Sequence, residues 1–520
     1  MRLSVSRLLE IRSYPEALRA FRWDALWDIF DGDRERLNLA HECVDRHVDR
    51  GTALRIKHAD GRTEEPSFGE LSEWSSRFAN LLERLGVQRG DRVAIMLEPS
   101  LSFYGALFGT LKRGAIAVPL FTLFGPDGVA LRVDDCRPRV LLVEREAERW
   151  RARFPHLVVL GADEVDERLA GERDRYAPST GAGDLAVFQY TSGTTRALPA
   201  AIRHTHRAVI TVMVAALYGV GLERGDRYFC PSSPAWGHGL WHGTIAPLAL
   251  GIPVGSYAGK FHGARVLEAL AEFEITNLAA APTVYRMLRE AGLTAAGARS
   301  LRKLSFTGEP MDSGTFEWLE QTVGRRPCGM YGSTEVGVII VNYPGFSDFE
   351  VRPGTLGKPA PGWEVAIVGD DGQPLGPGQP GEIAVRRKGA WFPVKDRGWI
   401  DADGYFHHGG RSDDVIISAG WTMSAVEIED ALLKHPDVRE VAVVGVADRR
   451  RGLVPKAFIV SDRRDPELAR ELQELVKTRL SQHEYPRLIE LVAELPKTPA
   501  GKTDRNALRL RARVAPDALE

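Results

Sequence analysis

The segment that most constrains the fold of this chain is Tyr190-Thr191-Ser192-Gly193-Thr194-Thr195, a short loop rich in hydroxyl groups. The apolar run 185–189 before it predicts a buried strand, and the apolar run 208–222 after it predicts a helix. Gly193 permits close backbone approach, consecutive N–H groups can form an anion-binding concavity, and hydroxyl groups donate to phosphate oxygens. The loop therefore fits either a phosphate-binding turn or an ordinary polar connection. It lacks the Gly-Lys-Ser/Thr ending of the Walker motif.

The bulk composition narrows the class of protein. A chain of 520 residues is too long for one core, which predicts at least two domains. Its hydrophobic share of 44% and charged share of 27% are typical of soluble globular proteins, and a net charge of −2 gives no basic field for nucleic acid. The first ten residues lack the apolar centre of a secretory signal, and the 208–222 run is too short to span a membrane.

The four cysteines, Cys43, Cys136, Cys230 and Cys328, are far apart and form neither a metal-binding spacing nor a disulfide framework. This usage is typical of a reducing compartment. We therefore expect a cytoplasmic protein that associates with neither nucleic acid nor membrane.

Strand-like and helix-like segments alternate along the chain. Helices are predicted at 38–47, 67–85 and 103–111, and strands at 93–97, 114–120, 140–143 and 157–160. This alternation predicts βαβ units around a largely parallel sheet, whereas the glycine- and proline-rich stretch 353–387 predicts a small antiparallel β unit.

The expected fold is α/β, with a large N-terminal domain over 1–410 and a small α+β C-terminal domain over 411–520. Within the large domain we expect subdomains at about 1–183, 184–350 and 351–410.

Five further motifs follow the loop in order. They are Gly308-Glu309-Pro310, Tyr331-Gly332-Ser333-Thr334-Glu335, Asp396 before Gly404-Tyr405, Gly410-Arg411-Ser412-Asp413-Asp414 and Thr498-Pro499-Ala500-Gly501-Lys502. In this order and spacing the chain resembles the adenylate-forming superfamily of acyl-CoA synthetases, peptide-synthetase adenylation domains and luciferases. The resemblance covers about 67–508 and, through 234–251 and 281–288, is closest to the acetyl- and medium-chain acyl-CoA synthetases.

The resemblance implies a carboxylic acid–CoA ligase whose partners are a small-molecule carboxylic acid, ATP, Mg²⁺ and CoA. Acyl adenylate formation needs a polyphosphate-binding loop, a metal ion, a cation near the α-phosphate and a binding site for adenosine. The residues that match the family's nucleotide site are Thr191, Ser192, Gly193, Thr194, Thr195, Gly308, Glu309, Pro310, Tyr331, Gly332, Asp396 and Arg411.

The remaining roles follow from the same resemblance. Lys502 matches the catalytic lysine, Thr334 can donate to the α-phosphate, and Glu335 is the expected catalytic metal ligand. The C-terminal domain of the family is mobile, and Asp413 matches its hinge. The CoA tunnel is matched by Ser418, Ala419 and Gly420, and the candidates for the acyl pocket are Trp236, His238, Gly239, Leu240, Gly308 and Val336.

The chain departs from the family directly after Thr195. The family continues Gly-X-Pro-Lys-Gly, whereas the segment 196–206 lacks the lysine and both glycines. Because guanidinium groups bind phosphate well, Arg196 or Arg203 is the hypothetical substitute.

The sequence is consistent with three functions: a CoA ligase, an adenylating enzyme that loads a separate carrier protein, and a non-catalytic nucleotide-binding relative. The sequence leaves the acid unnamed and allows a monomer or a homodimer.

Overall fold

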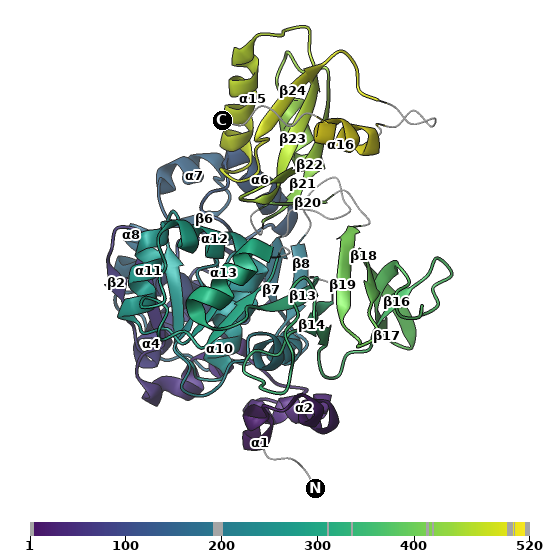
Figure 1. The fold of residues 1–520 in the computed structure, drawn as a ribbon. Helices are drawn as coiled ribbons and strands as arrows, with labels where there is room; N and C mark the ends of the chain where they lie inside the picture. Colours follow the sequence, from purple (N-terminus) through teal and green to yellow (C-terminus); the bar gives the residue numbers. More distant parts are fainter. Residues whose placement is uncertain are drawn as a thin grey trace.

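The computed structural model describes residues 5–190, 201–308, 311, 313–333, 336–411, 415–418, 421–496, 503 and 505–514. Within these residues the strands form four sheets of six, nine, four and five strands. Figure 1 shows a large N-terminal body with a smaller C-terminal domain above it. The structure confirms an α/β fold with a large N-terminal and a small C-terminal domain.

The first sheet consists of β3 (Arg92–Met96), β4 (Ile116–Pro119), β5 (Val140–Val143), β6 (Val158–Gly161), β7 (Leu185–Tyr190) and β8 (Ala201–Thr205). Its order is β6-β5-β3-β4-β7-β8, and every neighbouring pair except β7–β8 is parallel. The helices around it are α4 (Phe68–Arg84), α5 (Leu101–Lys112), α6 (Pro126–Cys136), α7 (Ala147–Arg153) and α8 (Ala162–Leu169). This arrangement confirms the predicted βαβ units.

Helix α4 illustrates how the sequence determines where a helix begins and how closely it packs on its neighbour. It begins in a capping box in which Ser67 Oγ accepts the Glu70 N–H at 3.1 Å and the Glu70 carboxylate accepts the Ser67 N–H at 2.8 Å. Gly105 and Gly109 on α5 then allow the two helices to approach. A Cβ atom at Gly105 would lie 2.0 Å from the Trp74 ring, so a side chain there would separate the helices.

The second sheet consists of β1 (Leu54–His58), β2 (Thr63–Glu64), β9 (Tyr228–Phe229), β10 (Val254–Ala258), β11 (Asn277–Ala280), β12 (Lys303–Phe306), β13 (Cys328–Ser333), β14 (Gly337–Val341) and β15 (Lys358–Pro359). Its order is β15-β14-β13-β12-β11-β9-β10-β1-β2. The helical segments of this half are α9 (Ala208–Val214), η3 (Ala215–Gly219), η4 (His238–Ile245), α10 (Ala246–Ala249), α11 (Gly263–Glu272), α12 (Pro282–Glu290) and α13 (Ser313–Val323).

The two sheets do not follow the predicted subdomain boundary at 183. Strands β7 and β8 lie beyond it in sequence but complete the first sheet, because β7 pairs in parallel with β4. Conversely, β1 joins the second sheet by pairing with β10, from Leu54 opposite Val254 to His58 opposite Ala258. Such parallel pairs connect residues that are far apart in the chain, so a local sequence pattern cannot predict them.

The glycine- and proline-rich region forms an antiparallel sheet, as predicted, which extends beyond residue 387. Its strands are β16 (Val365–Val368), β17 (Gly381–Arg387), β18 (Ala390–Ile400) and β19 (Phe406–Arg411). In Figure 1 it stands to the right of the second sheet.

The C-terminal domain has one sheet with helices on both faces. Its elements are β20 (Val415–Ser418), β21 (Trp421–Ser424), α14 (Ala425–Leu432), β22 (Glu440–Asp448), β23 (Gly452–Val460), α15 (Pro466–Arg479), β24 (Leu488–Val492) and α16 (Arg505–Val514). One apolar core contains residues of α14 and α15, and a second core on the other face contains Leu508 of α16. These cores support a separately folded unit.

Several short elements differ from expectation. The predicted helix at 38–47 is split into α3 (Leu39–Cys43) and the tighter turn η2 (Asp45–Arg50), because Val44 at φ −130° and ψ −63° interrupts the helical backbone. The predicted helix at 208–222 is α9 continued by the wider turn η3, which ends at Gly219. The remaining N-terminal helices are α1 (Val5–Glu10), α2 (Tyr14–Ala20) and η1 (Trp23–Ile29), which lie at the foot of the molecule in Figure 1.

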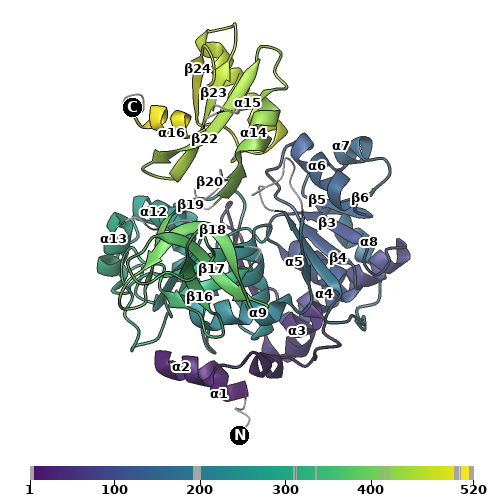
Figure 2. The ribbon, with the colours of Figure 1, turned by 90° about the vertical axis from the view of Figure 1, so that its right-hand side faces the viewer.

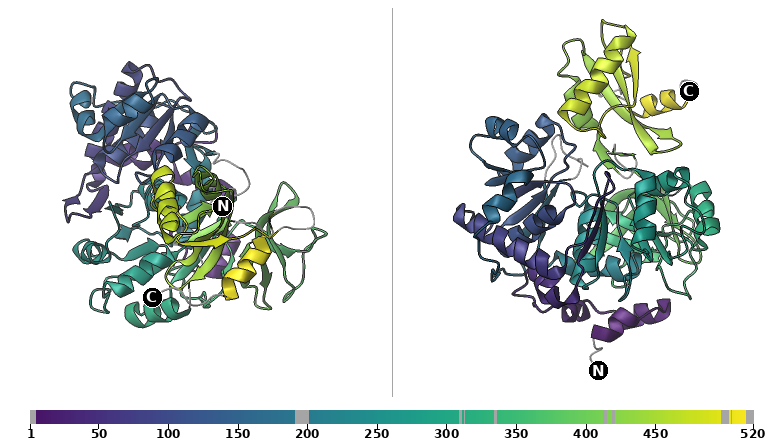
Figure 3. Two further views of the ribbon diagram at one scale, coloured as in Figure 1. Left: turned by 90° about the horizontal axis from the view of Figure 1, so that it is seen from above. Right: turned by 90° about the vertical axis from the view of Figure 1, so that its left-hand side faces the viewer.

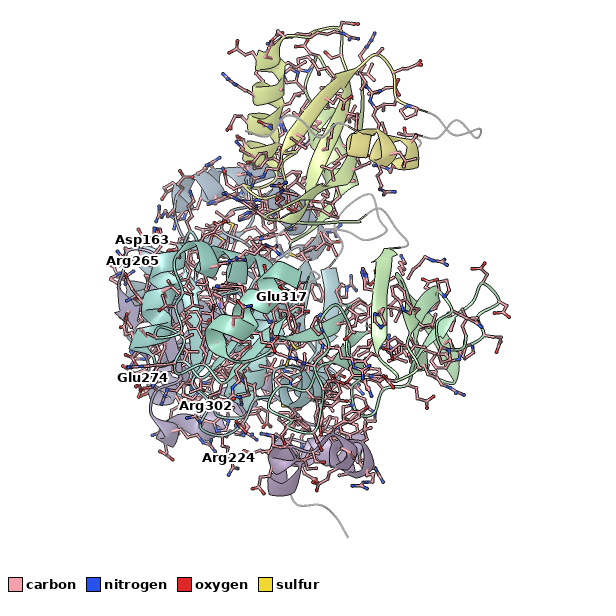
Figure 4. All side chains as sticks on the ribbon, in the orientation of Figure 1. Asp163, Arg224, Arg265, Glu274, Arg302 and Glu317 are labelled. Carbon is pink, nitrogen blue, oxygen red and sulfur yellow. The ribbon has the colours of Figure 1, made fainter. Side chains whose placement is uncertain are left out.

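The outer surface of the N-terminal body carries both signs of charge. Figure 4 labels Arg224, Arg302, Glu274 and Glu317 on one side of it, and all four are exposed. Among the described helices, none has the length and apolarity required to cross a membrane. The four cysteines are unpaired and buried.

The C-terminal domain docks on α6 of the first half. The Gly125 N–H donates to the Leu480 carbonyl at 2.6 Å, and a Cβ atom at Gly125 would lie 2.0 Å from the Thr478 carbonyl oxygen. Asp127 forms ion pairs with Arg479 and with Lys434. Figure 2 shows β20 reaching down toward the junction of the two α/β halves, and Figure 3 shows the domain lying over the middle of the larger body.

Candidate active site

A cavity of about 770 Å³ lies where the two α/β halves, the β16–β19 sheet and the C-terminal domain meet. We call it the central cavity. Of the described residues predicted for the site, Trp236, His238, Gly308, Tyr331, Gly332, Val336 and Asp396 line it. Residues 160 positions apart in sequence, from Trp236 to Asp396, thus share one space.

One wall of the central cavity carries the residues predicted to bind adenosine. The Tyr331 hydroxyl on β13 donates to Asp396 Oδ2 on β18 at 2.7 Å, and Asp396 is only 8% exposed. Arg411 is the register partner of Asp396 in the β18–β19 pair, so the backbone brings these two predicted residues side by side. His408 Nε2 lies 3.9 Å from Asp396 Oδ1. A buried carboxylate in such a wall can accept hydrogen bonds from the two hydroxyl groups of a ribose.

The backbone requires glycine at two positions of this wall. Gly308 follows β12 at φ +94°, a conformation that a side chain would strain. A Cβ atom at Gly332 would lie 1.9 Å from the Gly337 carbonyl oxygen, so the β13–β14 hairpin requires glycine there. Glu309, Pro310, Thr334 and Glu335 lie outside the described residues.

The predicted phosphate loop, Thr191 to Thr195, also lies outside the described residues, but both of its flanks are defined. Tyr190 ends β7, and its hydroxyl donates to Asp135 Oδ2 at 2.6 Å; the Ala201 N–H, at the start of β8, donates to the same oxygen at 3.3 Å. Burial raises the pKa of Tyr190, so its phenol stays protonated and remains a donor. Asp135 on α6 therefore holds the two ends of the segment 191–200 together.

The structure changes the interpretation of the segment after the loop. The sequence predicts a strand followed by a loop and a helix, whereas the structure inserts β8, antiparallel to β7. Because side chains alternate along a strand, His204 lines the central cavity while Arg203 does not. Arg203 lies over the Phe188 ring at 5.2 Å, outside the cavity lining. Its hypothetical contact with the γ-phosphate is therefore not supported, and Arg196 lies outside the described residues.

Only some of the acyl-pocket candidates line the central cavity. Trp236, His238 and Val336 line the central cavity, but Gly239 and Leu240 do not. A Cβ atom at Gly239 would lie 2.2 Å from the Ser233 carbonyl oxygen, so this glycine permits close packing of the turn 232–233. Gly239 and Leu240 lie outside the cavity lining, and their role in the acyl pocket stays a prediction.

The C-terminal domain closes the mouth of the central cavity with Ile417, Trp421 and Glu484. Ser418 is buried and pairs with Trp421 across the β20–β21 hairpin, next to the cavity but not among its lining residues. The Trp421 ring lies 4.3 Å from the Phe121 ring of the N-terminal domain. Asp413, Ala419, Gly420 and Lys502 lie outside the described residues.

A buried arginine meets two carboxylates at this mouth. Arg132 on α6 is 1% exposed, lies 3.8 Å over the Phe124 ring, and has Nη2 4.0 Å from Glu427 Oε2. Burial raises the pKa of Glu484, and the charge of Arg132 opposes that rise. Both carboxylates belong to the C-terminal domain, so this cluster joins the domains.

Sequence reasoning missed four residues of this region: Asp135, Arg132, His204 and His242. Asp135 and Arg132 are ordinary charged residues of an amphipathic helix, and nothing local distinguishes them. The two histidines stand next to predicted elements, His204 in the altered segment 196–206 and His242 just beyond the Trp236 motif. The signal that could have identified them is the spacing of His242 four residues after His238 and of His204 two residues before His206.

Family models match both parts of the chain. The model of the AMP-binding enzyme matches residues 42–391, and that of the AMP-binding enzyme C-terminal domain matches 427–502. The chain belongs to the AMP-binding enzyme family. The resemblance inferred from the motifs is thereby confirmed.

Individual AMP-binding enzymes match over almost the whole chain. The acetyl-coenzyme A synthetase of Bacillus subtilis is 31% identical over 96% of this chain and 95% of its own length. A mitochondrial acyl-coenzyme A synthetase of Rattus norvegicus is 32% identical, over 91% and 90%. The crystal structure of an acyl-CoA synthetase of Brucella canis has 30% identity and a TM-score of 0.72, covering 97% of this chain and 99% of that one. The protein is accordingly an AMP-forming acid–thiol ligase that uses ATP and CoA.

Proposed function

We propose that this AMP-binding enzyme activates a small to medium aliphatic, alicyclic or aromatic carboxylic acid in two steps. A carboxylate oxygen of the acid attacks the α-phosphorus of ATP and pyrophosphate leaves; the CoA thiol then displaces AMP from the acyl adenylate. The observation that carries the proposal is the hydrogen bond between Tyr331 and Asp396 in the lining of a cavity that the C-terminal domain also reaches. Arg411 is paired with Asp396 through the backbone of β18 and β19.

The roles within the first step follow from the site's chemistry. Asp396 accepts hydrogen bonds from the ribose hydroxyls, and Tyr331 packs beside the adenine. We assign the phosphates to Thr191 to Thr195, which follow Tyr190 and its contact with Asp135, and further nucleotide contacts to Gly308, Glu309, Pro310 and Gly332. Thr334 donates to the α-phosphate, and Lys502 offsets the negative charge that develops there.

A divalent cation fits the chemistry of this site, and Glu335 would supply a hard oxygen ligand for Mg²⁺. Glu335 follows β13, whose Tyr331 and Gly332 line the central cavity. Bound Mg²⁺ would offset the charge of the polyphosphate. Within the described residues, no group of histidine, cysteine, aspartate and glutamate side chains forms another candidate metal site.

The second step uses the arrangement described above. The β20–β21 hairpin faces the central cavity, and we propose that Ser418, Ala419 and Gly420 line the path of the CoA thiol. The helix α16, which begins three residues after Lys502, packs on the sheet face opposite α14 and α15. We therefore propose that the C-terminal domain, 411–520, turns about Asp413 between the two steps and exchanges Lys502 for the hairpin.

The test is an acid-dependent ATP–pyrophosphate exchange assay, followed by AMP release and thioester formation with CoA. A panel of acetate, butyrate, octanoate, benzoate and cyclohexanecarboxylate samples the proposed substrate range. Exchange that depends on an acid, with AMP and acyl-CoA formed in equal amounts, supports the proposal. Exchange without CoA consumption favours an enzyme that loads a separate carrier protein, and ATP binding without exchange favours a non-catalytic relative.

The four free thiols agree with a reducing compartment, which supports a cytoplasmic location as part of the proposal. The enzyme would act as a monomer or a homodimer.

A further inference from the structure

Three histidines line one wall of the central cavity: His204 on β8, and His238 and His242 on η4. We call this set the histidine wall. The rings of His238 and His242 lie 6.0 Å apart, and His204 packs edge-on against Trp241 at 4.9 Å. The histidine wall thus brings three imidazole rings into the region proposed to hold the acid.

The histidine wall has unused hydrogen-bonding capacity. His238 Nδ1 lies 3.0 Å from Ser232 Oγ, but its Nε2 has no hydrogen-bond partner among the described residues, although the residue is only 3% exposed. His204 Nε2 and His242 Nδ1 are also buried and have no hydrogen-bond partner among the described residues. Buried polar atoms are normally paired, so these three nitrogens are unusual. They are shielded from the cavity in the present ring orientations, so a ring must turn before its unpaired nitrogen can meet a bound molecule.

The nitrogens need not be fixed in place. A turn of 180° about the Cβ–Cγ bond exchanges nitrogen and carbon positions in an imidazole, so either edge can present a nitrogen to the cavity. A neutral imidazole carries one N–H donor and one acceptor nitrogen. The wall can therefore either donate to or accept from a group on a bound molecule.

The elements that carry the histidine wall add no charged side chain to the cavity lining. The charged lining residues come from other elements and are Arg132, Arg352, Arg387, Lys395, Asp396 and Glu484. On β7, β8, α9, η3 and the segment 236–242, the described residues that line the cavity include no Asp, Glu, Lys or Arg. Trp241 Nε1–H donates to Gln189 Oε1 at 3.0 Å, which uses that indole donor. Burial lowers the pKa of His204 and of His242 to about 4, and that of His238 to about 3, so all three rings are neutral at pH 7.

From this geometry we propose that the histidine wall selects acids that carry an uncharged hydrogen-bonding group, such as a hydroxyl or keto oxygen, on the acyl chain or ring. The inference rests on the proposed function and specifies its substrate class. An acid with a plain hydrocarbon chain leaves the imidazole nitrogens unpaired when it displaces water from the cavity. A dicarboxylic acid places a second charge opposite neutral groups, which disfavours its binding.

The test compares matched pairs of acids in pyrophosphate exchange. Each pair differs only by exchange of a hydroxyl for a methyl group: β-hydroxybutyrate with isovalerate, and each hydroxybenzoate with the toluate substituted at the same position. We expect at least one hydroxy acid to exceed its methyl partner in kcat/KM by about tenfold or more, because a site built to pair a polar group rejects the analogue that lacks it. Succinate and adipate should be poor substrates.

Variants of the wall assign the preference to its residues. His204→Phe, His238→Phe and His242→Phe should each lower the ratio of kcat/KM between the two acids of the preferred pair. His238→Gln keeps an amide that can donate or accept, and should retain more of the ratio than His238→Phe. His262→Phe, a change at an exposed histidine outside the cavity lining, serves as the control and should leave the ratio unchanged.

The ratio of kcat/KM values for two acids, measured on one preparation, does not depend on the fraction of folded protein. The ratio can therefore be measured even in a variant that folds poorly. The inference is overturned if methyl acids equal or exceed their hydroxy partners in every pair, or if the three phenylalanine variants leave the ratio intact. Acid-dependent exchange with only the unsubstituted acids would leave the proposed function standing while refuting the inference. Absence of exchange with every acid would refute both.

Discussion

The Tyr190 hydroxyl donates a hydrogen bond of 2.6 Å to Asp135 Oδ2. The same oxygen accepts the Ala201 N–H, so one carboxylate of α6 connects the residue before and the residue after the segment 191–200. A loop whose ends are held loses less conformational freedom when a polyphosphate binds.

Asp135→Ala should therefore weaken the use of ATP. The variant removes the acceptor of two hydrogen bonds of about 1 kcal/mol each. The Ala201 donor is exposed, and the Tyr190 hydroxyl keeps the Arg132 carbonyl at 3.1 Å as an acceptor, so we expect kcat/KM for ATP to fall by up to about tenfold. The apparent KM for the acid should change little. Asp134→Ala removes the neighbouring exposed carboxylate and is the control. Equal ATP kinetics in both variants would exclude Asp135 as a positioning residue.

Tyr331→Phe removes the donor that holds Asp396. Loss of one neutral-to-charged hydrogen bond, about 1.5–3 kcal/mol in a buried site, should raise the KM for ATP about tenfold or more and leave the acid dependence intact. The measurement is ATP titration in pyrophosphate exchange at saturating acid. Tyr257→Phe removes a hydroxyl that donates to the Lys260 carbonyl outside the cavity lining, and its ATP kinetics should match those of the parent.

Lys502→Ala should separate the two half-reactions. Because the proposed role of Lys502 is to offset charge at the α-phosphate, adenylation should fall by about 10²–10³-fold, while thioester formation from supplied acyl adenylate should persist. Lys260→Ala, a change at an exposed lysine, is the control. Equal loss of both half-reactions would contradict the exchange of Lys502 for the β20–β21 hairpin.

Gly125→Val should impair thioester formation and spare adenylation, the opposite of the effect expected for Lys502→Ala. Gly125 has φ −68° and ψ 167°, which valine can adopt, but a Cβ atom there would lie 2.0 Å from the Thr478 carbonyl oxygen. The docked arrangement with the hairpin at the cavity should be lost, so thioester formation should slow by at least tenfold while adenylation continues. Gly376→Ala is the control, because this glycine is exposed and an added Cβ atom would make only an ordinary contact of 3.9 Å with Gln379. It should leave both half-reactions unchanged. Normal thioester formation in Gly125→Val would show that this docking is not used in the second step.

Stability should fall as the pH is lowered below about 6.5, and His206 should contribute. His206 is fully buried, its Nδ1 accepts the Leu39 N–H at 3.1 Å, and burial lowers its pKa to about 4. The unfolded chain binds a proton near pH 6.5 and the folded chain does not until about pH 4, so acid favours unfolding between these values. The loss is about 1 kcal/mol between about pH 7.5 and about pH 5.5.

The variant His206→Asn keeps an acceptor for the Leu39 N–H but does not titrate. Denaturant unfolding at the two pH values should show a drop in the free energy of unfolding about 1 kcal/mol smaller than that of the parent. His262→Asn, at an exposed histidine, should retain the full drop. An unchanged drop in His206→Asn would mean that the unfolded-state protonation of this residue is not the cause.

Local sequence patterns determined the element types and the family. The helical spacing of apolar residues from Phe68 to Arg84, the alternation of strands with helices, and the turn-rich antiparallel region are all short-range signals, and the structure contains each of them. The motif around Tyr331 and the isolated Asp396 predicted an adenosine site, and the structure brings these two residues together in the lining of the central cavity.

The tertiary structure alone decided which residues meet across the chain. The pairing of β1 with β10 and of β7 with β4 overrides the order of the chain, so the sheets cross the expected boundary at residue 183. The insertion of β8 turned His204 toward the central cavity and Arg203 away from it, since a strand alternates its faces and the sequence does not state its register. The positions of Asp135, Arg132 and the histidine wall result from contacts between segments that are far apart in the chain. Residue spacing within one segment cannot predict such contacts, so only the folded structure shows that these side chains lie near the cavity.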